Sequence, residues 1–148
     1  MSTAETANTS TLATLPGEYM IYRLPPATPV TALPDDRAQQ RASLFALART
    51  GDELSLLCPA EWSGEQVATN VATDDLRSEG PWRALRFVGT LDFSLTGVIA
   101  RLGSVLAQAG ISVFVQSTFN TDYVLIRSER MHAALEALRA AGYRIDDR

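Results

Sequence analysis

The fold is decided by Thr96-Gly97-Val98-Ile99 and by the stretch at residues 111–126, ISVFVQSTFNTDYVLI. The first segment opens an amphipathic helix at a glycine, and Gly110 stands where a left-handed helix stop is favoured. The second segment is typical of two strands joined by a polar turn at Asn120-Thr121. This order places the N–H groups of a helix start beside the polar end of a strand. Such a corner suits a small zwitterion, with its carboxylate at the helix and its ammonium at an aspartate.

Hydrophobic spacing extends this pattern across the second half of the chain. Apolar residues recur at three-and-four spacing in two predicted helices, and Asp92 or Ser94 can cap the start of the first of them. The predicted order is strand, helix, strand, strand, helix, strand, which is a split βαββαβ sheet with two helices on one face. The predicted ranges are 82–90, 95–109, 111–116, 123–127, 129–141 and 143–145.

The first half of the chain shows a degenerate version of the same pattern. Residues 18–24 form a predicted strand, but the prolines of the following stretch prevent a long helix. Residues 43–57 align without a gap on residues 112–126, so the two starts lie 69 residues apart. A period of this length fits two small tandem domains. We therefore expect an α+β chain of two tandem ferredoxin-like βαββαβ domains, the first abbreviated, with a disordered tail at 1–14, a first repeat at 15–78 and a second at 82–146.

Composition and charge exclude several classes of protein. The 148 residues are 46% hydrophobic and 20% charged, which is ordinary for a globular chain. The net charge is -4, and the 13 basic residues are all scattered arginines, which argues against nucleic-acid binding. The single Cys58 excludes an internal disulfide, and no apolar run approaches the ~18 residues that cross a bilayer. We expect a cytoplasmic protein without membrane or nucleic-acid partners.

The sequence offers no assembled catalytic chemistry. His132 is the only histidine, and with Glu136 one helical turn on it is explained as a surface residue. No phosphate-binding glycine loop, dinucleotide fingerprint or supported Ser/His/Asp spacing is present. Cys58 is best explained as a packed, inert thiol. We therefore expect no catalytic residue, no metal, no cofactor and no enzymatic activity.

A resemblance rests on the residues at both ends of the first predicted helix and on the hairpin after it. These are Thr96–Ala100, Leu106–Ser112 and Ser117–Leu125. With them, residues 83–142 resemble an ACT domain, the small βαββαβ regulatory module of amino-acid metabolism. The hairpin is similar to that of a narrower group. This group consists of bacterial tandem-ACT proteins together with the animal cytosolic arginine sensor, which is built from the same module. The resemblance implies binding of a free amino acid without chemistry, at the loop between the first strand and first helix, where two ACT domains meet.

The resemblance also implies which residues would touch the ligand. Gly97 would let the backbone approach closely, and Asp122 would pair with the ammonium group. Each candidate has a structural alternative: Gly97 as a helix-start glycine, Thr96 as a cap, and Asp122 and Asn120 as turn formers. An exposed Phe119 would instead contact another subunit. The implied ligand-binding set is Asp92, Thr96, Gly97, Val98, Thr118, Phe119, Asn120 and Asp122.

Magnitudes indicate that such a site must be enclosed. A helix end contributes at most about 2 kcal/mol to an anion. A micromolar ligand requires about 8 kcal/mol in total. We therefore expect an amino-acid-binding regulatory module that senses its ligand at an ACT–ACT interface, where the second half meets the first half or another chain. We expect the chain to form a homodimer. The alternative is a structural dimerisation protein that keeps the fold without a ligand.

Overall fold

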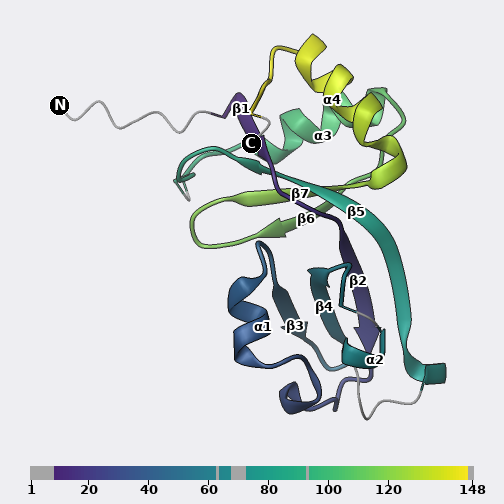
Figure 1. The fold of residues 1–148 in the computed structure, drawn as a ribbon. Coiled ribbons are helices and arrows are strands. Elements are labelled where there is room, and N and C mark those ends of the chain that lie inside the picture. Colours follow the sequence, from purple (N-terminus) through teal and green to yellow (C-terminus); the bar gives the residue numbers. More distant parts are fainter. Residues whose placement is uncertain (1–8, 63, 68–72, 93, 147–148) are drawn as a thin grey trace. The chain divides into compact units, whose positions relative to one another are not determined.

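The computed structural model describes residues 9–62, 64–67, 73–92 and 94–146 (Figure 1). The chain forms two compact units. Unit 1 combines residues 1–16 with residues 82–148, and unit 2 consists of residues 17–81. Unit 2 is therefore inserted in sequence between the first strand of unit 1 and the rest of it.

Unit 1 contains the predicted βαββαβ order. Its helices α3 and α4 lie on the same face of the sheet (Figure 1). They bury Leu102, Leu106 and Leu138 against Phe87 and Ile126 of the strands. The elements are β5 (Arg77–Phe87, in unit 1 from Trp82), α3 (Val98–Gln108), β6 (Phe114–Ser117), β7 (Asp122–Arg127), the 3-10 turn η3 (Ser128–Arg130), α4 (Met131–Ala140) and β8 (Arg144–Asp146).

An additional strand, β1 (Thr11–Thr14), lies between β5 and β8. Leu12 stands opposite Phe87 in the antiparallel pairing and opposite Ile145 in the parallel pairing. The sheet of unit 1 therefore runs β6-β7-β5-β1-β8. The expected disordered tail at 1–14 is wrong for residues 11–14, because Leu12 is fully buried in the core. Residues 9–10 form a described turn before β1, and residues 1–8 of that expectation lie outside the described residues.

Unit 2 contains the antiparallel strands β3-β4-β2, followed in the sheet order by β5, whose residues 77–81 belong to this unit. Unit 2 has its own core. Its apolar centre includes Leu24, Leu56 and Trp62. The proline-rich stretch holds only a 3-10 turn and a six-residue helix, as proline density predicts. The elements are β2 (Tyr19–Leu24), η1 (Val30–Ala32), α1 (Asp36–Arg41), β3 (Ala46–Arg49), β4 (Leu54–Pro59), α2 (Gly64–Val67) and η2 (Thr73–Asp75).

The β3–β4 and β6–β7 hairpins share one turn geometry. In the first, Thr50 N–H donates to the Glu53 carbonyl at 2.9 Å, and in the second, Thr118 N–H donates to the Thr121 carbonyl at 2.8 Å. The threonine hydroxyl donates to the same carbonyl in both. These turns match at a spacing of 68 residues, so the gapless 69-residue alignment is wrong by one at this point. The common turn supports the tandem repeat, which stays a prediction.

Several predicted boundaries shift in the structure. Helix α3 begins at Val98 with Gly97 as its N-cap, so neither Asp92 nor Ser94 caps it. Residues 79–81, which separate the two predicted repeats, are part of the long strand β5. No helix in the described ranges combines the length and apolarity needed to span a membrane.

Candidate functional site

Unit 1 contains a cavity of about 320 Å³ between the start of α3 and the β6–β7 turn. This volume is in the range of small-ligand pockets. The cavity brings together all but two of the residues predicted to bind a ligand. Asp92, Gly97, Val98, Thr118, Phe119 and Asp122 line it, whereas Thr96 and Asn120 do not.

The helix side of the cavity is built by the backbone of Gly97. Its φ of 76° is left-handed, which glycine adopts without the penalty that a Cβ would bring. As N-cap it has no side chain to satisfy the first turn, and Arg101 N–H makes the first helical bond to its carbonyl at 2.9 Å. None of the described residues accepts a hydrogen bond from the N–H groups of Val98, Ile99 or Ala100. This wall can therefore receive an anion.

The opposite side of the cavity presents the carboxylate of Asp122 at the start of β7. The residue is half-buried and faces Ser117 across the hairpin. The Ser117 hydroxyl donates to Asp122 Oδ1 at 2.5 Å and so fixes its orientation. Within the described part of the chain, no arginine forms an ion pair with this carboxylate. Asp122 is thus available to a cationic ligand group.

Backbone and hydroxyl bonds hold the two walls together. Leu91 N–H donates to the Asn120 carbonyl oxygen at 2.7 Å, which joins the loop after β5 to the hairpin turn. The buried Thr121 hydroxyl donates to the Phe87 carbonyl at 3.2 Å. Asn120 therefore contributes to the site through its main chain, although its side chain does not line the cavity.

A second carboxylate, that of Asp92, stands at the cavity mouth. Ser94 N–H donates to Asp92 Oδ1 at 2.7 Å, and Leu95 N–H donates to the Asp92 carbonyl at 3.0 Å, so these residues form a tight local turn. Hydrogen bonds from the Ser94 side chain and backbone lower the pKa of the Asp92 carboxyl. Asp92 is exposed and anionic at neutral pH, and the neighbouring Thr96 is exposed outside the lining.

Two apolar side chains form the rim of the cavity. Phe119 is 79% exposed and Leu95 is 40% exposed, one on each wall. Exposed large apolar side chains beside a hollow are typical of surfaces that another molecule covers. The mouth of the cavity therefore lies open in the isolated chain.

Sequence reasoning missed part of the lining, although signals for it existed. With Gly97 as the N-cap, Ile99 and Ala100 lie in the first turn of α3, and this position predicts that they line the cavity. Ser117 follows from the hairpin register, because it stands directly opposite Asp122. The missed lining residues are Leu91, Leu95, Ile99, Ala100, Ser117 and Thr121.

Outside the cavity, the reactive side chains of the described residues show no assembled chemistry. Cys58 lies buried in unit 2, and burial raises the pKa of its thiol to about 12, so it stays protonated at neutral pH. His132 pairs with Glu136 on the exposed surface of α4 at 3.1 Å. No group of three histidine, cysteine or acidic residues in the described ranges could hold a metal ion.

Comparison with known proteins identifies the unit that carries the cavity. Residues 77–140 match the family described as ACT domain. The chain contains an ACT domain. It is also related to a human protein named cytosolic arginine sensor for mTORC1 subunit 1, with 27% identity over 114 residues and 76% of this chain. The corresponding protein of Pongo abelii is 27% identical over 113 residues. The chain spans about a third of the length of these relatives, 34%.

Solved structures confirm the mixed α+β ACT fold. A crystal structure of a protein from Agrobacterium tumefaciens is similar, with a TM-score of 0.74 and 29% identity, covering 93% of this chain and 92% of that one. The ligand-free regulatory subunit of aspartate kinase from Thermus thermophilus shares the fold, with a TM-score of 0.60 and 16% identity. That likeness covers 88% of this chain and 95% of the subunit.

Proposed function

We propose that this ACT domain binds a free amino acid in the unit 1 cavity and acts as a non-catalytic regulatory sensor. The observation that carries the proposal is the pairing of two opposite groups in one hollow. The open N–H groups of the first α3 turn suit a carboxylate, and the half-buried Asp122 suits an ammonium. The name of the human relative, an arginine sensor, supports an amino acid as the ligand class.

The contrast between the two units supports unit 1 as the binding unit. In unit 2, Asp35 caps α1 with its own carboxylate, which accepts from Ala38 N–H at 3.0 Å. In unit 1, Gly97 has no side chain to play that role. The start of α3 is therefore open to an external carboxylate, whereas the start of α1 is already satisfied.

Enclosure is the second part of the proposal. The exposed rim of Leu95 and Phe119 leaves the mouth open to water, which screens the charges of a ligand. A second ACT surface over this rim would exclude that water, so we propose that sensing occurs at an ACT–ACT interface in a cytoplasmic homodimer. The same rim favours an alternative, a dimerisation platform without a ligand. Light scattering with and without amino acids distinguishes the sensor from the platform. A platform predicts a dimer whose dissociation no amino acid changes.

The charge of the site predicts selectivity among amino acids. Two carboxylates, Asp92 and Asp122, line the cavity, and no basic side chain of the described residues does. A ligand with an acidic side chain meets like charge there, so we expect L-arginine to bind at least about tenfold tighter than L-glutamate. Isothermal titration calorimetry measures both affinities.

The same order of affinities is expected at pH 5. Because the pKa of Asp92 is lowered, this carboxyl stays ionised as pH falls toward its ordinary pKa and becomes neutral only below that lowered value. Equal binding of glutamate and arginine would contradict the assigned site chemistry. Absence of heat with every common amino acid would end the proposed function.

A further inference from the structure

Arg101 lies one helical turn behind the anion-binding end of α3 and does not line the cavity. Its N–H closes the first hydrogen bond of the helix, to the Gly97 carbonyl at 2.9 Å. The main chain of Arg101 is therefore linked directly to Gly97. The residue stands where it can set the position of one wall of the site.

The guanidinium of Arg101 contacts three residues in two segments of unit 1, one before β1 and one between α4 and β8. Its Cζ lies 4.6 Å from the centre of the Tyr143 ring. Nη1 donates to Ser10 Oγ at 3.3 Å, and Nη2 donates to the Ala141 carbonyl at 3.5 Å. A planar group with several fixed donors can make these contacts at once, and a lysine ammonium cannot.

These contacts join α3 to the β1–β8 side of the sheet. The Ser10 carbonyl accepts from Arg144 N–H at 2.8 Å, at the point where β1 and β8 meet. Tyr143 is only 4% exposed, so its ring is a fixed platform in the core. The Tyr143 hydroxyl is buried without a hydrogen-bond partner among the described atoms. The polar contact of Tyr143 is therefore the one between its ring face and the Arg101 guanidinium.

We propose that Arg101 is a positioning residue of the amino-acid site and couples its occupancy to β1. The inference rests on the proposed function and adds a regulatory route to it. A ligand carboxylate at the first turn of α3 restrains that turn, and the guanidinium transmits the restraint to Ser10 and Tyr143. Strand β1 ends at Thr14, three residues before unit 2 begins at Gly17. Ligand binding at α3 would therefore restrain the strand that precedes the inserted unit.

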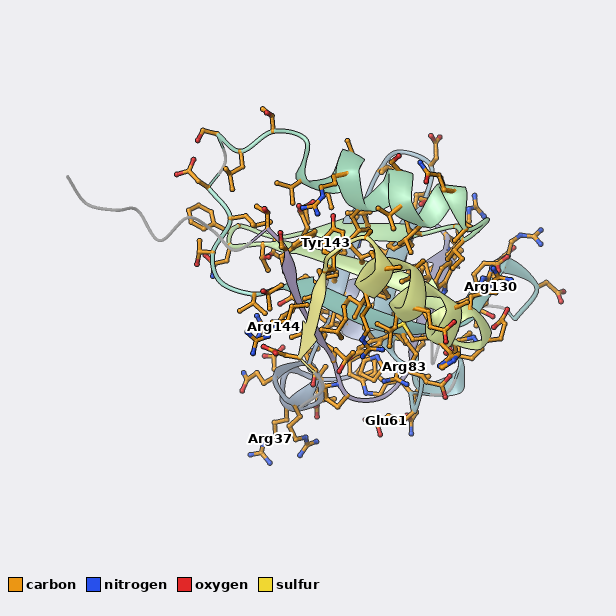
Figure 2. All side chains as sticks on the ribbon, turned by 90° about the horizontal axis from the view of Figure 1, so that it is seen from above. Arg37, Glu61, Arg83, Arg130, Tyr143 and Arg144 are labelled. Atoms are coloured by element: carbon orange, nitrogen blue, oxygen red, sulfur yellow. The ribbon has the colours of Figure 1, made fainter. Side chains whose placement is uncertain are left out.

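The other end of α3 offers a matched control. Arg130 Nη2 donates to the Ala109 carbonyl at 3.4 Å, so it holds the C-terminal end of the same helix through a comparable exposed contact. Figure 2 shows Tyr143 and Arg130 toward opposite ends of this helix. If Arg101 acts merely by stabilising α3, substitution of either arginine should have a similar effect.

The test measures the affinity of L-arginine for the full chain and four variants by calorimetry. Arg101→Met is expected to weaken binding about 3- to 30-fold, the range of substitutions that act through positioning. Arg101→Lys is expected to give the same loss within about twofold, and Ser10→Ala a loss of about two- to threefold. Arg130→Met is expected to stay within about twofold of the parent chain. The melting temperature of each variant shows that it is folded.

Hydrogen exchange measures the effect of the ligand on β1 separately from the overall stability of each variant. L-arginine is expected to slow exchange of the Arg144 and Val88 amides, which donate to Ser10 and Thr11 carbonyls, about threefold or more. Arg101→Met should abolish this slowing, and Arg130→Met should keep it.

Each remaining outcome decides between the two proposals. Full affinity in Arg101→Lys would assign the effect to charge and overturn positioning. Equal affinities for Arg101→Met and Arg130→Met, with the parent chain still binding, would overturn this inference and leave the proposed function intact. If the parent chain binds none of the common amino acids, the proposed function and the role of Arg101 fall together.

Discussion

Asp122→Asn is expected to weaken amino-acid binding by about 10- to 100-fold. The substitution keeps the shape of the side chain and an oxygen that accepts from the Ser117 hydroxyl, so the hairpin stays in place. It removes the negative charge that receives the ligand ammonium, and a hydrogen bond to a charged group contributes about 1.5–3 kcal/mol. Titration calorimetry with L-arginine measures the loss.

Asp146→Asn is the matched control for this loss. Asp146 lies at the end of β8, outside the cavity lining, and its closest cationic contact is Arg144 at 3.9 Å. Removing this charge changes the net charge of the chain by the same amount. We expect binding within about twofold of the parent chain. An equal loss in both variants would show that only the overall charge matters and would contradict the role of Asp122.

Leu12→Ala is expected to cost about 2–5 kcal/mol of the unfolding free energy of unit 1. Leu12 is fully buried and lies in β1, between Phe87 of β5 and Ile145 of β8. Truncation leaves a cavity under the middle of the sheet and weakens the strand that completes it. Urea unfolding followed by tryptophan fluorescence, together with hydrogen exchange of β5 and β8, measures the effect.

Val30→Ala provides the comparison for this truncation. Val30 is 52% exposed in unit 2, so its removal is expected to change stability by less than about 0.5 kcal/mol. A cost at Leu12 as small as that at Val30 would contradict the placement of β1 in the core. It would instead agree with the disordered tail that the sequence alone predicts.

The βαββαβ order was readable from the sequence because its signals are local. Apolar spacing marked α3 and α4, and Gly110 marked the end of α3, where the structure has a left-handed glycine. Strand β1 was missed because residues 11–14 contain one apolar anchor, Leu12, among threonines and alanine. Such a short segment becomes a strand only through its neighbours β5 and β8, which no local pattern reveals.

The candidate site was predicted as a region more accurately than as a set of side chains. Gly97 and Asp122 meet because helix start and hairpin end are adjacent in any βαββαβ sheet. The role of Asn120 was not predictable, because it depends on the turn that Thr118 and Thr121 close. A shift of one residue in a strand exchanges the two faces, and the gapless repeat alignment contained such a shift.

We propose that a ligand carboxylate binds the open start of α3 while the ligand ammonium binds Asp122. A titration of the ¹⁵N-labelled chain with L-arginine tests it most directly, since each backbone amide reports separately. The largest shifts are expected at the amides of Val98, Ile99 and Ala100 and at Asp122, saturating together at one dissociation constant. Saturating shifts elsewhere, with these amides unchanged, would contradict it.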